Sequence, residues 1–361
     1  MRRKISLLAA CLMLISMVTL TAGADMTMIA GQLTRESIPF KGSYPDNEVK
    51  PGVSTTTGLP YDGPYLPIML VIDNAPAAHP HWGVVDADVM YQVPNAGGGA
   101  TKLLALFSDK APQEAGGIRS ARVPFLDIAA TWGAVLVHAG SPGKTGNPLS
   151  DVPARIAQLG GRSSGLFYDA LGNNNYSQRV NWQSSPHDLS IYVEKIRDTL
   201  ISQGKTFQPR GFKFTDEAPQ GIPAVNIELN HRGNKEDALS NPASWSAFRY
   251  DANEGGYLRT NSSGPYMDLL KPYLNIPFAN VIVQRTPITG MSGGYVALEK
   301  LVGRGAADLF IGGVYIEGGW QRDSHDSRTV YIGPDGEEIS LLRGRTFIII
   351  TNDVTEVTFG Q

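Results

Sequence analysis

Cysteine is almost absent from this sequence. Among 361 residues the only cysteine is Cys11, which lies in an N-terminal apolar segment. If that segment is removed, the mature chain has no disulfide, no thiol chemistry and no thiolate metal ligand. Stability must then come from a hydrophobic core, which a chain of this length with 42% apolar residues can bury.

Clustered positive charge is also lacking. The formal net charge is −3, and the first 24 residues contain three basic residues and no acidic one, so their removal gives −3 − 3 = −6. A mildly acidic chain without a basic block is not expected to bind nucleic acid through its phosphates. The sequence also has no P-loop, no Gly-x-Ser-x-Gly nucleophile motif and no evident acid/base carboxylate pair.

The N-terminus has the three parts of a secretion signal. Arg2 to Lys4 are basic, Ile5 to Leu20 are mainly apolar, and Ala22-Gly23-Ala24 is a small-x-small cleavage site. We therefore expect residues 1–24 to be a signal peptide and the protein to be extracytoplasmic, in the cell envelope or secreted. Two alternatives are an uncleaved membrane anchor and a lipid anchor at Cys11, although few apolar residues precede that cysteine.

The rest of the chain divides by composition into three parts. Residues 25–60 have few long apolar runs and predict a flexible tether. Residues 61–208 predict an N-terminal α/β domain with a mixed sheet, and residues 222–358 predict a smaller, mostly antiparallel β domain rich in turns. The expected fold class is therefore mixed α/β (α+β).

Apolar runs and helical spacing predict the elements of the first domain. Strands are expected at 68–72, 89–93, 102–107 and 134–138. Helices are expected at 121–132, 152–159 and 189–203, the last capped by Asp188 or Ser190. In the second domain, strands are expected at 224–229, 244–250, 256–260, 279–285, 309–316, 328–332 and 345–351.

Polar residues follow several of these strands and predict a ligand site at one edge of the sheet. A helix beginning near Ser120, beside Arg119 and Arg122, would present free N–H groups and two guanidinium groups to an anion. Alternatively, the two arginines pair with Asp73, Asp86 or Asp88 and hold loops together. The candidate ligand-binding residues are Asp73, Asn74, Arg119, Ser120, Arg122, His138, Ser141 and His187.

Histidine chemistry is open to several interpretations. His138 and His187 could be general bases, ligands or hydrogen-bonded structural residues. His79 and His81 form a His-x-His pair, but Pro80 favours a loop and no third ligand is evident, so no metal or cofactor is expected. A polar stretch from Trp320 to Asp326 is an alternative partner-binding surface.

Short motifs in a fixed order resemble the YerB-like proteins, a bacterial family. They are Thr57–Pro60, Ile72–Asn74, Ala87–Tyr91, Gly98–Thr101, Ile118–Arg122, Gly140–Pro142 and Pro186–His187, followed by Asn280–Gln284, Gly318–Trp320 and Asp335–Ile339. The resemblance covers residues 57 to 355. It implies an envelope protein, often a lipoprotein, with two domains of unknown function.

The sequence also departs from the family pattern that this resemblance implies. The family usually has Glu where Gln92 stands, an acid at Gly97, Arg at Lys102 and Asn at Asp188. If those acids were catalytic in relatives, this chain would be inactive. We therefore favour a non-catalytic module that binds an anionic ligand or an envelope partner. The alternative is a hydrolase or transferase acting on an anionic envelope substrate.

Overall fold

The computed structural model describes residues 27–31, 37–97, 99–172, 175–231, 245–261, 264–291, 294–298, 301–353 and 355–361. The expected signal peptide therefore lies outside the described residues. None of the helices in these ranges is long and apolar enough to span a membrane.

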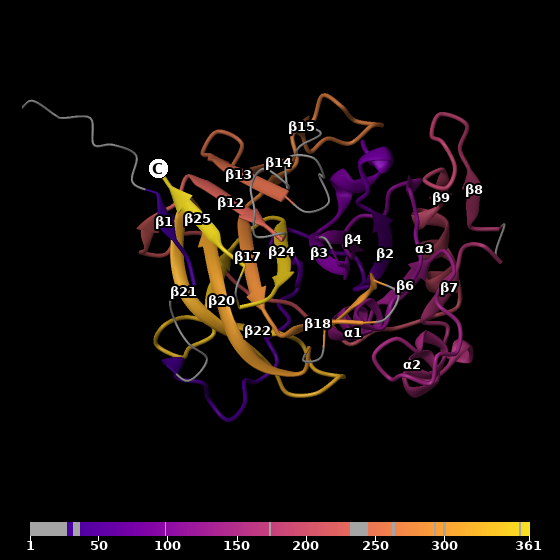
Figure 1. Ribbon diagram of the computed structural model, residues 1–361, viewed down its shortest axis with the longest axis horizontal. Coiled ribbons are helices and arrows are strands. Elements are labelled where there is room, and N and C mark those ends of the chain that lie inside the picture. The colour runs from indigo at the N-terminus through magenta and orange to yellow at the C-terminus, as the bar shows by residue number, and fades with distance from the viewer. Residues whose placement is uncertain are drawn as a thin grey trace, which may run out of the picture.

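One long sheet runs through both halves of the chain (Figure 1). β24 lies parallel to β3, with Ile348 opposite Tyr91, and so joins the C-terminal strands to the N-terminal ones. Its strands, in spatial order, are β11 (Ile222–Pro223), β21 (Val314–Arg322), β20 (Gly303–Ile311), β17 (Asn280–Arg285), β24 (Thr346–Thr351), β3 (Val89–Ala96), β4 (Ala100–Phe107), β2 (Ile68–Asp73), β6 (Val135–His138) and β7 (Phe167–Asp169), with β22 (Val330–Ile332) paired to β21.

A second sheet packs on one face of this central sheet. Phe248 and Phe278 of the second sheet contact Phe347 of β24 edge to face, with ring centroids 5.1 and 5.0 Å apart. The strands of the second sheet are β1 (Met28–Ile29), β25 (Val357–Gly360), β12 (Asn226–Asn230), β13 (Trp245–Asp251), β14 (Gly256–Asn261), β15 (Gly264–Pro265) and β16 (Pro277–Phe278).

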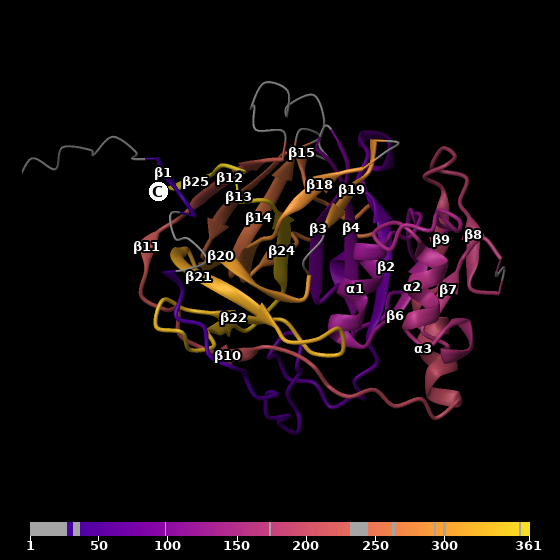
Figure 2. The same cartoon turned by 60° about the horizontal axis from the view of Figure 1, so that its bottom comes forward.

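Three α-helices occur in the described residues, and all lie near the N-terminal strands (Figure 2). α1 (Val123–Trp132) and α2 (Val152–Gln158) pack on one face of the central sheet, whereas α3 (Val193–Ser202) packs on the face that the second sheet also covers. The remaining strands form three small sheets. In one, β9 (Leu189–Ile191) lies between β5 (Ala115–Gly116) and β8 (Ser177–Arg179). In the other two, β10 (Lys213–Thr215) pairs with β23 (Ser340–Leu342), and β18 (Ile288–Gly290) pairs with β19 (Val296–Leu298).

The four strands expected in the first domain are confirmed, because β2, β3, β4 and β6 cover them within a few residues. The helix expected at 121–132 is confirmed with a later start, at Val123, and Pro124 occupies its first turn. The protein is more strongly β than a balanced α/β fold, since strands make up most of its regular structure.

Two expected elements are wrong in detail. Residues 189–191 are a strand, and the helix begins only after Tyr192, so neither Asp188 nor Ser190 caps it. Leu189 and Ile191 are buried by pairing with β8 and β5, which the three- and four-residue spacing alone cannot distinguish from a helix. Residues 309–316 are not one strand, because Gly312 and Gly313, both with positive φ, turn the chain between β20 and β21.

The end of the expected tether is packed. Ser54, Thr56 and Thr57 are almost fully buried. Thr56 Oγ1 donates to Asp88 Oδ2 at 3.0 Å, and Thr57 Oγ1 donates to Asp109 Oδ2 at 2.8 Å. The prediction of a flexible tether therefore does not hold for residues 54–57, because their hydroxyls bind the buried Asp88 and the half-buried Asp109.

Candidate functional site

The segment from Gly117 to Ala121 is wedged between the ends of β2 and β6. Asp73 N donates to Gly117 O at 3.0 Å, and Arg119 N donates to Val71 O at 2.8 Å. On the other side, Ala139 N donates to Arg119 O at 2.9 Å. These backbone bonds fix Arg119 at the edge of the sheet where β2 and β6 end.

Asp73 is the centre of the site. It ends β2, its residue is fully buried, and its carboxylate faces three basic side chains. Arg119 Nε lies 2.9 Å and His187 Nδ1 2.7 Å from Asp73 Oδ2, while Lys102 Nζ contacts Oδ1. Lys102 lies opposite Asp73 in the register of β2 and β4. The fold thus gathers Asp73, Arg119 and His187, three of the predicted residues.

The cations determine the charge of this carboxylate. Burial alone would raise the pKa of Asp73, but Lys102 and then Arg119 more than offset it and lower the pKa to about 2. Burial lowers the pKa of Lys102, and the ion pair with Asp73 opposes that shift. The Asp73 carboxylate is therefore ionised at neutral pH.

Arg122 adds a third cation that Asp73 does not neutralise. Its Nη1 donates to Ala121 O at 2.8 Å, and its guanidinium lies 4.8 Å from the ring centroid of Tyr295. Its Nε is buried without a hydrogen-bond partner. Arg122 also contributes to the lowered pKa of Lys102, so the two charges act on each other. Lys102, Arg119 and Arg122 against Asp73 leave a surplus of two positive charges.

Gly117 allows His187 to reach Asp73. A Cβ at position 117 would lie 2.1 Å from His187 O, well inside any normal contact. The adjacent Gly116 is equally confined, because a Cβ there would lie 2.2 Å from the Trp82 ring. The glycine pair therefore has a packing role: it lets the loop before β9, which carries His187, approach the end of β2.

The other predicted residues surround this cluster without joining it. Asn74 Nδ2 donates to Thr101 Oγ1 at 2.8 Å, and its Oδ1 lies 3.1 Å from His79 Nε2. Ser120 and Ser141 are half-buried in the loops before α1 and after β6. The helix begins at Val123 and has no side-chain cap, so the predicted helix start at Ser120 is wrong.

His138 is a buried structural residue in this fold. Its side chain is almost fully enclosed, and Nδ1 lies 2.9 Å from Gly140 O. Burial lowers its pKa, with an opposing contribution from Asp169, which accepts from Gly140 N at 2.9 Å. These contacts stabilise the loop after β6 and do not link His138 to Asp73.

The His-x-His pair has its own hydrogen bonds. His79 contacts Asn74, and His81 Nε2 lies 2.5 Å from the carbonyl oxygen of Asp73. Burial lowers the pKa of His79 to about 2 and that of His81 to about 4. In the part of the chain that the structure describes, no three His, Asp or Glu side chains are grouped to hold a metal ion.

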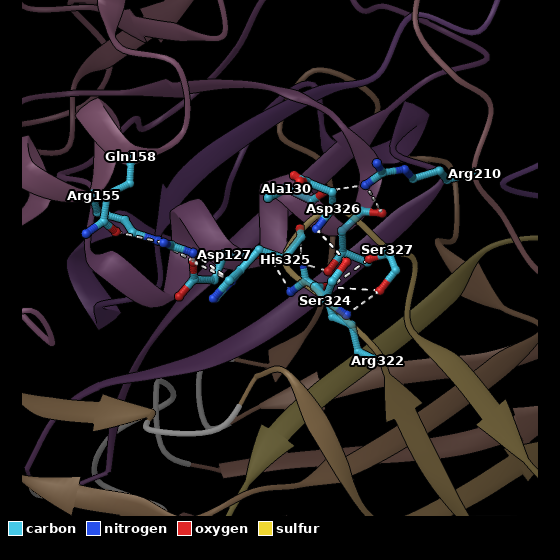
Figure 3. A network of polar contacts seen from close by, with 11 residues as sticks. Asp127, Ala130, Arg155, Gln158, Arg210, Arg322, Ser324, His325, Asp326 and Ser327 are labelled. Atoms are coloured by element: carbon cyan, nitrogen blue, oxygen red, sulfur yellow. Dashed lines mark hydrogen bonds and ion pairs between the residues drawn. The ribbon is translucent and has the colours of Figure 1, made fainter. Parts of the chain in front are cut away.

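The stretch from Trp320 to Asp326 makes polar contacts with α1 and α2, and Figure 3 shows those of Arg322 and His325. Trp320 and Arg322 belong to β21 and are almost fully buried. Arg322 Nη1 donates to Asp127 O at 2.8 Å, and Arg155 Nε donates to Asp127 Oδ1 at 2.7 Å. Arg155 Nη2 also lies 2.6 Å from His325 Nδ1. The predicted exposed loop is therefore wrong for Trp320 and Arg322: Trp320 Nε1 donates to Arg285 O of β17 at 2.7 Å, and Arg322 joins β21 to α1.

Sequence reasoning did not include Lys102 among the site residues. The sequence could have indicated it, because Lys102 stands at the start of one apolar run and Asp73 at the end of another. It also missed the carboxylates of Asp88 and Asp109 at the opposite edge, where burial, then Asp109, raises the pKa of Asp88 to about 7. Asp109 lines a surface hollow of about 350 Å³ with Ser54 and Tyr61.

Residues 56–206 match the N-terminal domain, and residues 238–348 the C-terminal domain, of a protein of unknown function (DUF3048). The chain belongs to this two-domain family. It is 24% identical over 302 residues to "Putative lipoprotein YerB" of Bacillus subtilis (strain 168), covering 82% of this chain and 84% of that protein.

A solved structure has the same fold. The crystal structure of the YerB protein from Bacillus subtilis superposes with a TM-score of 0.68 at 21% identity. The match covers 84% of this chain and 99% of that one.

Proposed function

We propose that this protein is a non-catalytic binding module of the cell envelope that recognises an anionic group at the edge formed by β2, β4 and β6. The observation that carries the proposal is the surplus of two positive charges around Asp73. Lys102 and Arg119 are only partly engaged by that single carboxylate, and Arg122 has no acidic partner among the described residues.

The accessibility of the cations supports binding from solvent. The Arg119 side chain is 30% exposed and that of Lys102 is 16% exposed, whereas Asp73 is 1% exposed. An incoming phosphate or carboxylate would therefore meet the cations first. Hydrogen bonds from guanidinium groups to such anions are charge-assisted and stronger than those between neutral groups.

The envelope location rests on two observations. The N-terminal segment has the basic, apolar and cleavage regions of a secretion signal. The Bacillus relative bears the name of a lipoprotein. We propose that this chain is likewise exported, so that its anionic ligand or partner is an envelope component such as a cell-wall fragment.

Calorimetric titration with phosphate- or carboxylate-bearing cell-wall fragments tests the proposal. Arg119→Ala should weaken the Kd about tenfold, the effect of one lost charge-assisted contact. Its melting temperature should change little, because Lys102 still neutralises Asp73 and the His187 ring still contacts its carboxylate. Arg249→Ala is the matched control, since Arg249 is an exposed arginine on β13.

Two results would reject a binding role for this edge. One is wild-type protein that binds none of these fragments. The other is equal weakening by Arg119→Ala and Arg249→Ala, which would reflect net charge rather than a site.

An enzymatic role has one observation in its favour. His187 Nδ1 lies 2.7 Å from Asp73 Oδ2, an arrangement in which a carboxylate orients an imidazole that accepts a proton. Against it, no serine or threonine hydroxyl of the described residues is hydrogen-bonded to His187. Turnover of such a fragment that His187→Gln abolishes, with affinity unchanged, would establish hydrolysis or transfer instead of binding.

A further inference from the structure

Four arginines are buried among the described residues, and one of them differs from the rest. Arg285 lies 2.8 Å from the carboxylate of Asp308. Arg328 forms a two-pronged pair with Glu338, at 2.6 and 2.8 Å. Arg322 donates to three carbonyl oxygens. The fourth, Arg259 of β14, is 2% exposed and has no carboxylate within 4 Å among the described residues.

The partners of Arg259 are neutral. Its Nη2 donates to Gln92 Oε1 at 3.1 Å and to Ser246 Oγ at 3.0 Å. Its guanidinium carbon lies 5.0 Å from the ring centroid of Tyr266 and 5.3 Å from that of Phe347. Its Nη1 is buried and has no hydrogen-bond partner. A buried charge without a counter-charge is costly, and an open donor nitrogen adds to that cost.

The titratable side chains around Arg259 cannot supply the missing negative charge. The guanidinium contributes to the lowered pKa of His79, His81 and His231, for each of which burial is the largest cause. The three histidines are therefore neutral at pH 7. Burial lowers the pKa of Arg259 itself to about 10, which still leaves it charged.

We infer that the space beside Arg259 Nη1, between the two sheets, is an internal site for one compact monovalent anion, either a halide or a small carboxylate. One guanidinium supplies one positive charge, so a monovalent ion balances it. Nη1 carries two N–H groups, neither of which is hydrogen-bonded, so one of them can donate to a halide or to one oxygen of a small carboxylate.

This site is separate from the Asp73 cluster. Gln92 and Arg259 lie on the face of the central sheet that packs against the second sheet, whereas Lys102 points to the face that α1 covers. Alternation along β4 places Lys102 with Leu104 and Leu106, which pack with α1, and along β3 places Gln92 with Met90, which packs with the second sheet.

Thermal unfolding of the full chain in three sodium salts at equal ionic strength tests the inference. Chloride and formate are compact, and gluconate is the bulky control. We expect the wild-type Tm to be about 2–4 °C higher in at least one compact anion than in gluconate. A shift in chloride alone identifies a halide site, and a shift in formate alone identifies a carboxylate site.

Gln92→Glu provides the decisive variant. It places a carboxylate where Gln92 Oε1 now meets Arg259, so the variant should melt higher than wild type in gluconate and lose its response to compact anions. Arg119→Ala should keep the full response, which separates this site from the Asp73 cluster. Equal Tm values of the wild type in all three salts, or a response that survives Gln92→Glu, would overturn the inference.

Discussion

Asp73 and Asp88 are both buried aspartates, yet the protein treats them in opposite ways. Asp73 closes β2 and is surrounded by cations, which lower its pKa to about 2. Asp88 precedes β3 at the opposite edge of the same sheet. Its Oδ2 accepts from Ser108 N, Asp109 N and Thr56 Oγ1, and burial, followed by Asp109, raises its pKa to about 7.

The difference teaches that burial alone does not decide the state of a carboxylate. At one edge, Lys102 and Arg119 overcome the cost of burial and leave positive charge to spare. At the other edge, the three groups that donate to Asp88 Oδ2 are neutral, and a second carboxylate, that of Asp109, makes ionisation more costly. One edge of the sheet therefore keeps an ionised carboxylate, whereas at the other edge the buried carboxylate of Asp88 keeps its proton to a higher pH.

We call the sheet edge where Asp73, Lys102, Arg119 and Arg122 lie the cationic edge. The largest expected effect is that of removing the carboxylate charge of Asp73 there. Asp73→Asn leaves Lys102 and Arg119 without their counter-ion, and we expect a loss of about 3–5 kcal/mol in the free energy of unfolding. Urea denaturation at pH 7 measures it. Asp86→Asn is the control, because the Asp86–Lys271 pair is partly exposed and should matter by less than about 1 kcal/mol. A loss as small as that of the control would show that the cations do not depend on Asp73.

At the opposite edge, where Asp88 and Asp109 lie, the expected effect on the free energy of unfolding depends on pH. The folded pKa of Asp88, about 7, lies above the unfolded value of 3.8, so the folded state binds more protons between these values. Its contribution to stability is therefore lost as pH rises from about 4 to about 7, by roughly 1 kcal/mol per pH unit.

Asp88→Asn should remove that slope while keeping an oxygen acceptor for the N–H groups. The difference between the variant and wild-type unfolding free energies, followed from pH 4 to pH 7, isolates Asp88. This subtraction is needed because the buried histidines act in the opposite direction: His81, with a folded pKa of about 4, favours the folded state less as pH falls below 6.5. Parallel curves for the two proteins would contradict the raised pKa.

Gly117→Ala tests how closely the cationic edge is assembled. The added Cβ would meet His187 O, so we expect His187 to move from Asp73 at a cost of about 1–3 kcal/mol. Thermal unfolding gives the cost, and the NMR signal of the His187 ring reports the displacement. Gly143→Ala is the control, since a Cβ at 143 has no neighbour within 4 Å. Equal stability of the two variants would mean that the contact at Gly117 relaxes freely.

The smallest expected effect concerns the ring beside Arg122. Tyr295→Leu removes a cation–π contact at a partly exposed site and should cost about 0.5–1 kcal/mol. Tyr295→Phe keeps the ring and should cost less than half as much. Chemical denaturation of both variants distinguishes them, and identical losses would mean that the ring contributes no more than apolar contact.

The strands of the N-terminal half were predictable because each is a short apolar run bounded by turn residues. The gathering of Asp73, Arg119 and His187 follows partly from the same pattern, since polar residues at strand ends meet at a sheet edge. The partner of Lys102 could not be predicted, because it depends on the register between β2 and β4. The polar residues at 320–326 led to the wrong prediction of an exposed stretch. The burial of Arg322 could not be predicted, because it depends on where α1 packs.

Long-range pairing was the least predictable feature. Thr346–Thr351 and Val89–Ala96 are far apart in the sequence. In the fold they are parallel neighbours, and their pairing joins the strands of the two halves of the chain into one sheet. Neither segment contains a local signal for the other. The place of Arg259 against Gln92 results from this pairing and from the stacking of the second sheet.

The most direct test of the cationic edge is a calorimetric titration with inorganic phosphate of the wild type, Asp73→Asn and Arg122→Gln. If the edge is an anion site in which Asp73 competes with the ligand, Asp73→Asn should bind phosphate more tightly than the wild type, and Arg122→Gln more weakly. The comparison of Arg122→Gln with the wild type tests the site even if Asp73→Asn does not fold. Phosphate binding that is absent from the wild type, or unchanged by Arg122→Gln, would contradict the account.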